Sequence, residues 1–298
     1  MTRSTVLVLA LAACRVDGID LAGKACPCPA GYVCDLSTNT CAHSATPGDG
    51  APDTPNTTYD LTTGLQYYFK LDEPSGQSVV DSSPNANNGY ALSATHTTWT
   101  AGRVGGALHF DGTGYSSYVI YPSASGTCGS NTLATTGSFT AAAWVRFDSF
   151  KPYNGYTIGD AAMMHGTSGG MEGGWGLGAT DGCNSETAAI TVTNPSDQRI
   201  NRCGTTALAA DTWYHLTGVY NATARSLDLY VNGVIDTGPL TAGSAQVPTS
   251  INAPSAQCPY LAAASNQQLL LVGSLDEVRF YTRALTADEV GALYRASM

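Results

Sequence analysis

The sequence predicts an all-β domain that ends in a short helix. Charged residues make up only 12% of the 298 residues, and there are 33 glycines, a composition that favours turn-rich β structure over long surface helices. Apolar and polar residues alternate over 65–71, 139–147 and 213–236, which is the period of a half-buried strand. The last of these runs contains Asn232-Gly233, a pair typical of tight hairpin turns.

The closing stretch, Gly273 to Ser297, combines a strand with a capped helix. Val278 and Phe280 alternate with polar neighbours, which predicts a buried strand. Thr286 precedes the final apolar pattern and Glu289 follows three residues later. This spacing predicts a capping box, in which each of the two side chains accepts a hydrogen bond from the backbone N–H of the other residue.

The first thirteen residues have the pattern of a signal peptide. Arg3 is followed by an apolar run over 6–13 that is far too short to span a bilayer. Leu11-Ala12-Ala13-Cys14 resembles the lipobox of bacterial lipoproteins, which implies cleavage before Cys14 and its lipidation. Arg15 then implies the outer membrane. Ordinary secretory cleavage stays open, so the expected location is secreted, or on the surface of a bacterium as a lipoprotein.

The cysteine count predicts disulfides. Setting Cys14 aside, eight of the nine cysteines remain, an even number that suits an oxidising compartment. They are Cys26, Cys28, Cys34, Cys41, Cys128, Cys183, Cys203 and Cys258. The first four lack the C-x2-C spacing that zinc favours, so we expect two disulfides among them, in any of three connectivities. The strand predicted between Cys183 and Cys203 favours their pairing, which leaves Cys128 with Cys258.

These features divide the chain into four parts: a signal peptide over 1–13, a cysteine-rich mini-module over 14–43, a linker over 44–63 and the main domain over 64–298. Pro, Gly, Asp and Thr dominate the linker, which shows no apolar period. The formal net charge of −10 argues against a nucleic-acid partner, because phosphate binding needs a basic surface.

Several motifs of the main domain resemble the laminin G-like, concanavalin A-like jelly-roll domains. They are Gly-Gly-Ala-Leu-His-Phe-Asp-Gly at 105–112, Phe-Thr-Ala-Ala-Ala-Trp-Val at 139–145, Trp-Tyr-His at 213–215 with Leu-Asp-Leu-Tyr-Val-Asn-Gly at 227–233, and Leu-Asp-Glu-Val-Arg-Phe-Tyr at 275–281. The resemblance extends over about 65–296. It implies a two-sheet antiparallel jelly-roll sandwich with a short C-terminal helix.

The same resemblance implies one structural calcium ion. The candidate ligands are Asp276, Asp111, Gly112 and Asp72. Asp276 opens the closing strand, as does an aspartate that binds calcium on the convex face of related sandwich enzymes, and oxygen ligands from carboxylates and turn carbonyls suit this ion. The alternative is that Asp276 accepts hydrogen bonds from backbone amides and so pins the strand, while Glu277 pairs with Arg279 or Arg283.

A ligand site is expected between Phe150 and Cys183, where ten glycines accompany several aromatic residues. Sugars stack on aromatic rings and bond to Asn and Asp, so the candidates are Tyr153, Tyr156, Trp175, Asp181 and Asn184. The alternative is that Trp175 belongs to the core and that the tyrosines only pack the loops.

Catalytic patterns are absent from the sequence. No carboxylates have the Glu-x-Asp-x-x-Glu spacing of sandwich glycoside hydrolases, and no Gly-x-Ser-x-Gly elbow accompanies the histidines. The adjacent pairs Asp72-Glu73 and Asp276-Glu277 are expected to point to opposite faces of a strand, so neither pair could flank one glycosidic bond.

The sequence therefore predicts a non-catalytic extracellular recognition domain, lipid-anchored and monomeric, that binds carbohydrate or a cell-surface partner. One alternative is a structural or adhesive surface module without a small ligand. A glycan-active enzyme is a third reading, against which the missing carboxylate spacing counts. Binding to a polysaccharide array would separate the first two, and release of reducing sugar would support the third.

Overall fold

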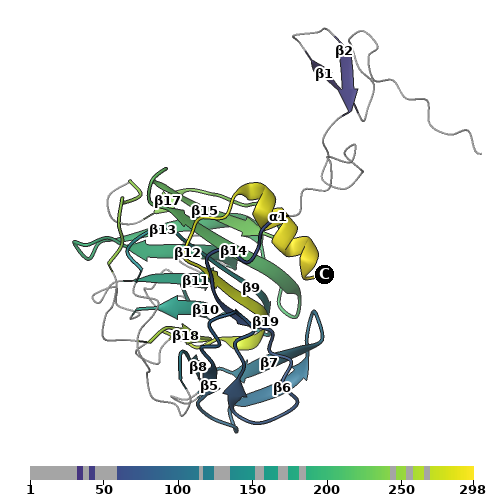
Figure 1. Ribbon diagram of the computed structural model, residues 1–298, viewed down its shortest axis with the longest axis vertical. Coiled ribbons are helices and arrows are strands. Elements are labelled where there is room, and N and C mark those ends of the chain that lie inside the picture. Colours follow the sequence, from purple (N-terminus) through teal and green to yellow (C-terminus); the bar gives the residue numbers. More distant parts are fainter. Residues whose placement is uncertain are drawn as a thin grey trace, which may run out of the picture. The chain divides into compact units, whose positions relative to one another are not determined.

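The structure, a computed structural model, describes residues 32–35, 40–43, 59–113, 117–123, 135–151, 158–166, 174–180, 186–241, 246–252, 258–264 and 269–298 (Figure 1). The chain forms two compact units, Met1–Thr58 and Tyr59–Met298. In the first unit, β1 (Tyr32–Asp35) pairs antiparallel with β2 (Thr40–His43), and Cys34 lies opposite Cys41.

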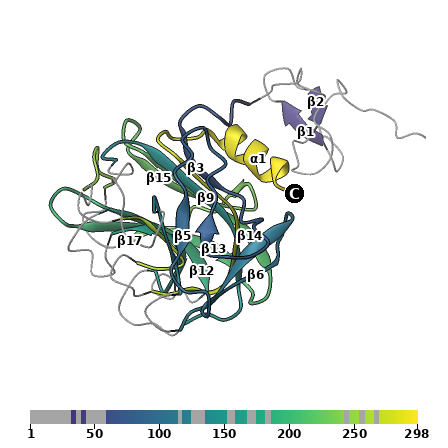
Figure 2. The ribbon, with the colours of Figure 1, turned by 60° about the horizontal axis from the view of Figure 1, so that its bottom comes forward.

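The second unit is a sandwich of two antiparallel sheets, as the sequence predicts (Figures 1 and 2). The nine-stranded sheet has the order β17 (Leu240–Thr241), β13 (Arg199–Ala207), β12 (Thr187–Thr193), β11 (Trp175–Thr180), β10 (Asp160–His165), β18 (Tyr260–Leu261), β8 (Val119–Ile120), β5 (Gly89–Ala91) and β4 (Ser78–Val79). The eight-stranded sheet has the order β16 (Val234–Ile235), β15 (Ser226–Val231), β14 (Trp213–Asn221), β9 (Phe139–Phe147), β19 (Val272–Tyr281), β7 (Gly106–Asp111) and β6 (Thr97–Ala101), and β3 (Leu65–Phe69) also pairs with β19.

The core lies between the two sheets because one face of each strand is apolar. On β9, Phe139, Val145 and Phe147 point inward and are fully buried. The intervening residues of β9 project from the outer face of the eight-stranded sheet. The closing strand β19 is central to its sheet, because it lies between β9 and β7, both of which are far from it in sequence (Figure 1).

The helix α1 (Ala287–Ala296) covers part of that outer face (Figure 1). The predicted capping box is confirmed: the Glu289 N–H donates to the Thr286 hydroxyl at 3.3 Å, and the Thr286 N–H donates to the Glu289 carboxylate at 2.8 Å. Val290 and Leu293 are buried in an apolar cluster with Tyr281 of β19. This cluster fastens the end of the chain to the sheet.

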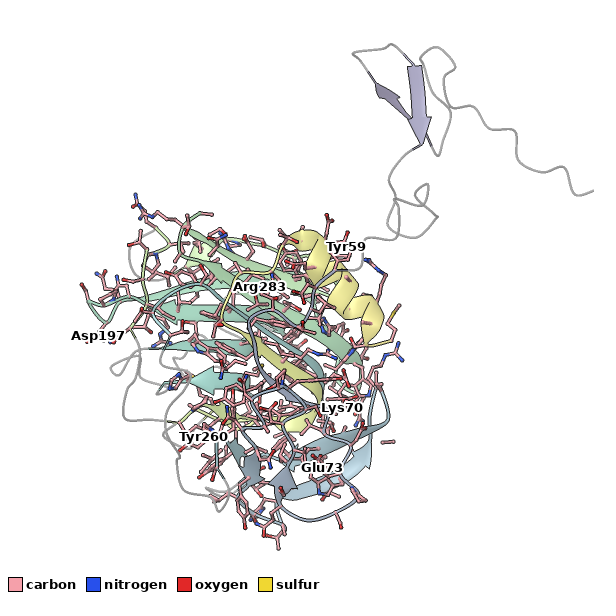
Figure 3. The ribbon with its side chains drawn as sticks, viewed as in Figure 1. Tyr59, Lys70, Glu73, Asp197, Tyr260 and Arg283 are labelled. Atoms are coloured by element: carbon pink, nitrogen blue, oxygen red, sulfur yellow. The ribbon has the colours of Figure 1, made fainter. Side chains whose placement is uncertain are left out.

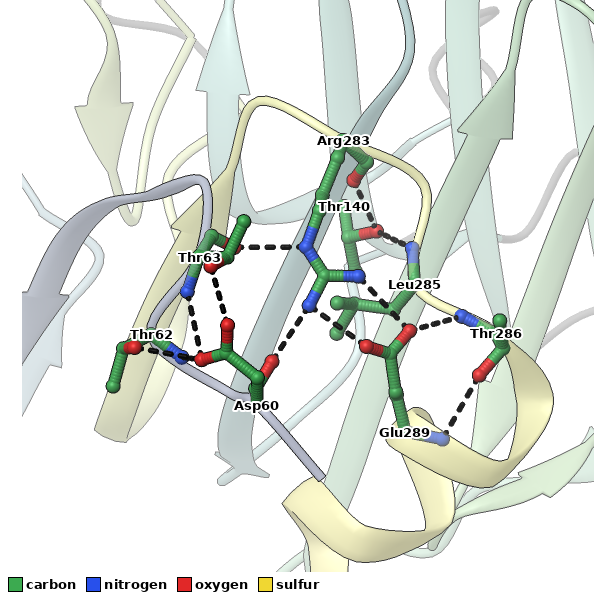
Figure 4. A network of polar contacts seen from close by, with 8 residues as sticks. All are labelled: Asp60, Thr62, Thr63, Thr140, Arg283, Leu285, Thr286 and Glu289. Carbon is green, nitrogen blue, oxygen red and sulfur yellow. Dashed lines mark hydrogen bonds and ion pairs between the residues drawn. The ribbon is translucent and has the colours of Figure 1, made fainter. Parts of the chain in front are cut away.

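The second unit begins before the domain start predicted at Gly64, because Arg283 ties residues 60–63 to α1 (Figure 4). Its guanidinium donates to the carbonyls of Thr63 and Asp60, each at 2.8 Å, and to the Glu289 carboxylate at 2.9 Å. Residues 59–63, which the composition assigns to the linker, therefore belong to the sandwich unit. Among the described residues, no helix is long and apolar enough to cross a membrane.

Candidate functional site

Four of the five predicted ligand-binding residues, Tyr153, Tyr156, Asp181 and Asn184, lie outside the described residues. The described residues that flank them meet at one end of the nine-stranded sheet. Asp160 lies opposite Ala179, and Thr180 lies opposite Thr187. The two segments 152–157 and 181–185 are therefore connected to neighbouring strand ends.

Polar contacts hold this end of the sheet together. The Lys151 N–H donates to the Asp160 carboxylate at 3.0 Å, and the Lys151 ammonium donates to the Leu270 carbonyl. Burial lowers the pKa of Lys151, while the nearby Asp160 opposes that shift. Lys151, which directly precedes the segment 152–157 with Tyr153 and Tyr156, is therefore held in place by bonds to Asp160 and Leu270.

Trp175 does not belong to this group, which corrects its assignment as a ligand-binding residue. It begins β11 at the opposite end of the sheet and is only 2% exposed. Its ring stacks on Phe280, with centroids 4.9 Å apart, and lies 5.2 Å from Phe139. Because core rings cover it, the indole offers no open face to a sugar.

A bulge in β19 places Asp276 and Glu277 on the same face, so the expectation that they point to opposite faces is wrong. The register of β19 against β9 shifts between Asp276 and Arg279, and Glu277 has a φ of 52°. Such a bulge inserts one residue and breaks the alternation of a strand. A left-handed conformation is uncommon for a non-glycine residue, and no local sequence signal announces it here.

Glu277 is held in a buried contact on this outer face. Arg279 donates to its carboxylate at 2.6 Å, and the Tyr68 hydroxyl donates to it at 2.8 Å. The Arg279 guanidinium also lies 4.0 Å from the centre of the Tyr68 ring, in a cation–π contact. The predicted alternative of a Glu277–Arg279 pair is therefore found.

Asp276 is fully buried and has one carboxylate oxygen without a hydrogen-bond partner. Its Oδ2 accepts from the Val104 N–H at 2.8 Å, whereas Oδ1 has no partner. Burial, helped by the nearby charges of Glu277 and Asp72, raises the pKa of Asp276 to about 7, although the backbone hydrogen bonds oppose this. This hydrogen bond ties β19 to the turn between β6 and β7, which agrees with the alternative prediction that Asp276 accepts from a backbone amide and pins the closing strand.

The four predicted calcium ligands are not brought together. Asp72 accepts from the Gly106 N–H at 2.6 Å and so approaches the same turn as Asp276. Asp111 lies at the other end of β7, opposite Val272, where His96 bonds to its carboxylate at 2.8 Å. Asp276 follows Val272 by four residues on β19, so along the strands it lies roughly 13 Å from Asp111 at the rise of a strand.

Calcium binding therefore stays a prediction that involves Asp276 and Asp72 rather than Asp111 and Gly112. The unpartnered Oδ1 of Asp276 suits a hard cation. Against this, the turn directs N–H groups, not carbonyls, at both carboxylates. In the described part of the chain, no group of three or more His, Cys, Asp or Glu side chains could hold a metal ion.

The predicted disulfide and lipidation residues are only partly described. Cys203 and Cys258 are 0% and 2% exposed. Cys183 and Cys128, their predicted partners, lie outside the described residues, as do Cys14, Cys26 and Cys28. The disulfide pairing thus stays a prediction.

Comparison with known proteins supports the fold. The family model described as the concanavalin A-like lectin/glucanases superfamily matches residues 113–291. No curated protein sequence matches the chain.

Several solved structures share the sandwich. Domain 4 of AbnA, a GH43 extracellular arabinanase from Geobacillus stearothermophilus in complex with arabinotriose, matches with a TM-score of 0.55 and 16% identity, over 78% of this chain and 99% of that one. The binding domain of Paraclostridial Mosquitocidal Protein 1 matches with a TM-score of 0.54 and 16% identity, over 78% and 52%. The binding domain of botulinum neurotoxin DC in complex with rat synaptotagmin II matches with a TM-score of 0.53 and 10% identity, over 79% and 52%. This chain thus spans about half the length of the last two of these chains.

Proposed function

The chain belongs to the concanavalin A-like lectin/glucanases superfamily, and from that membership we propose that residues 59–298 form a non-catalytic domain that recognises carbohydrate outside the cell. The observation that carries this proposal is the match of nearly the whole sandwich to domain 4 of an arabinanase, a domain seen with arabinotriose. Because a fold alone hosts many functions, the particular residues of this chain must supply the rest of the argument.

The segments 152–157 and 181–185 are the proposed ligand site. They contain Tyr153, Tyr156, Asp181 and Asn184, and they join neighbouring strand ends at Asp160 and Thr180. Tyrosine rings provide apolar faces for sugar rings, and carboxylate and amide groups bond to hydroxyls. Loops on a rigid sheet are the usual place for such groups.

Burial of the acidic pair supports the non-catalytic reading. Although Asp276 and Glu277 share a face, they are only 0% and 4% exposed. Glycoside hydrolysis needs two carboxyl groups that flank the scissile bond, so both must be reached by the substrate. A polysaccharide therefore cannot reach this pair, both members of which belong to the described residues.

A glycan array probed with the full chain tests the proposal. We expect binding to at least one glycan of the array, which Tyr153→Ala and Asp181→Ala weaken at least about tenfold. Tyr59→Ala, a change at the start of the sandwich unit, is the matched control and should bind as the wild type does. Absence of binding to every glycan, or release of reducing sugar from any of them, would refute the proposal.

A protein on a cell surface is the second candidate partner. It is favoured by the botulinum neurotoxin DC binding domain, which was solved in complex with rat synaptotagmin II. Binding to deglycosylated cells, with an empty glycan array, would support this candidate over the first.

We also propose that Cys14 is lipidated, that the remaining cysteines form disulfides, and that the N-terminal unit and linker tether a monomeric sandwich to a bacterial surface. Mass spectrometry of the mature N-terminal peptide tests the lipid, and thiol labelling before and after reduction tests the disulfides.

One structural calcium ion is proposed at Asp276 and Asp72. Ligand linkage at a hundredfold excess over Kd stabilises a protein by about 2.7 kcal/mol. A thermal shift with Ca²⁺ that EDTA reverses and that Asp276→Asn abolishes would support this site.

A further inference from the structure

A polar row crosses the outer face of the eight-stranded sheet, away from the proposed loop site. Five residues are in register on adjacent strands: Thr98 of β6, His109 of β7, Ser274 of β19, Arg146 of β9 and Trp213 of β14. These strands lie side by side in Figure 1. Four strand spacings make the row roughly 19 Å long, which suits an extended oligomer.

The row has an aromatic end and a hydrogen-bonding middle. Trp213 is partly exposed. The side chains of His109 and Arg146 are 29% and 33% exposed, and Thr98 is exposed. A partly open indole next to fixed polar groups is the combination that sugar recognition uses, because the ring stacks and the polar groups bond to hydroxyls.

A charge network holds the polar groups of the row in place. The imidazole of His109 contacts the Asp148 carboxylate at 2.9 Å, and Arg146 lies 3.4 Å from the other oxygen of that carboxylate. Arg146 also forms an ion pair with Asp211, whose side chain is 66% exposed. Because His109 and Arg146 are both paired with Asp148, these two side chains have little conformational entropy left to lose when a ligand binds.

Ser274 forms the floor of this row and has an unused hydroxyl. The residue is 1% exposed, and its Oγ has no hydrogen-bond partner. It lies opposite His109 on one side and Arg146 on the other. Because this hydroxyl is enclosed between the two side chains, an oligosaccharide on the row would lie over His109 and Arg146 without contacting Ser274.

We propose that this row is a second carbohydrate-binding surface, and that it accepts neutral oligosaccharides. Two carboxylates, Asp148 and Asp211, accompany the single guanidinium of Arg146, so the network is negative with a neutral imidazole and uncharged with a protonated one. Both carboxylates already occupy Arg146. A uronate or sialylated chain would therefore meet two carboxylates and, among the described residues of this network, no unpaired cation, so it should bind more weakly than a neutral chain.

The grouping of Ser274, His109 and Asp148 does not make a hydrolase triad. A nucleophilic serine needs a hydrogen bond to its base and access to the substrate. Ser274 Oγ has no bond to His109 and is buried. The surface is therefore a binding surface.

Titration of the full chain on an array of neutral and acidic oligosaccharides, followed by calorimetry with each neutral probe that binds, tests the proposal. Trp213→Ala should weaken neutral binding at least about tenfold, and Trp213→Phe should retain most of it, because the ring remains. Thr98→Ala, which removes an exposed hydroxyl at the other end of the row, should weaken binding by a smaller factor. Tyr90→Ala, on the outer face of the nine-stranded sheet, is the control and should bind normally.

The result also separates the two surfaces. If Trp213→Ala weakens binding and Tyr153→Ala does not, the row is the binding surface and the loop site fails. If only Tyr153→Ala weakens binding, the loop site stands and the row is overturned. Equal binding of acidic and neutral probes, or no binding to either, also overturns it.

Discussion

Replacing Asp276 with asparagine should stabilise the sandwich unit at pH 8 in the absence of calcium. Asparagine keeps an oxygen that accepts from the Val104 N–H, which bonds to Asp276 at 2.8 Å. It removes a carboxyl group that becomes charged in a site without solvent exposure. The substitution therefore preserves the contact with the turn and deletes the cost of ionisation.

The size of the effect follows from the pKa of Asp276, which burial raises from 3.8 to about 7. In the unfolded chain the group loses its proton above pH 4, whereas in the folded chain it keeps the proton until about pH 7. The folded state thus binds more protons between these values, and stability falls as pH rises through this window. At 1.36 kcal/mol for each pKa unit, the loss at pH 8 is about 4 kcal/mol.

Thermal unfolding in EDTA at pH 4, 6 and 8 measures this effect. For a unit of this size, each kcal/mol shifts Tm by about 2–4 °C, so Asp276→Asn should raise Tm by roughly 8–16 °C at pH 8 and by little at pH 4. Asp72→Asn is the comparison variant: it removes only an exposed neighbouring charge, a minor contributor to the raised pKa of Asp276, so it should raise Tm at pH 8 by much less. A lower Tm for Asp276→Asn at pH 8, or a difference that does not vary with pH, would refute the reasoning.

Three further predictions concern the core, pH and the clamp on α1. Trp175→Ala should lower the free energy of unfolding by about 3–5 kcal/mol in urea, because the ring is packed against Phe280, and an unchanged midpoint would contradict its core position. Burial lowers the pKa of His215 to about 3, so between pH 6.5 and 3 only the unfolded state binds a proton at this residue. The free energy of unfolding should therefore fall as the pH drops from 6.5 towards 3. His215→Gln should make this fall less steep. Arg283→Met should lower the free energy of unfolding by about 1–3 kcal/mol, because it removes the bonds of the guanidinium to Thr63 and Glu289. It should also speed hydrogen exchange in 287–296 but not in β12. Equal exchange in wild type and variant would show that Arg283 does not hold α1 in place. Arg225→Met, in the β14–β15 hairpin, is the control for that experiment.

Local patterns were sufficient for the framework of the sandwich. Alternation over 139–147 predicts β9, and Thr286 with Glu289 predicts the start of α1, because both signals depend on residues that are neighbours in the sequence. The jelly roll itself followed from the family resemblance, because alternation alone does not order strands within a sheet.

Other assignments required the tertiary structure. Alternation identifies two faces of a strand but not which one is buried, so the Gly-rich surroundings of Trp175 suggested a ligand-binding residue where the ring instead packs in the core. The bulge at Glu277 breaks the period of two without a glycine to announce it, and it places two adjacent carboxylates on one face.

The row from Thr98 to Trp213 illustrates the division most clearly. Four of its five residues, all except Thr98, could be assigned to a strand from the sequence, because strand formation depends on local alternation. Their register on five adjacent strands depends on which strands pair, and those pairings join segments far apart in the chain. The sequence thus determined the strands and the helix cap of this protein, whereas only the tertiary structure decided which polar side chains share a surface, because that surface is made by long-range strand pairing.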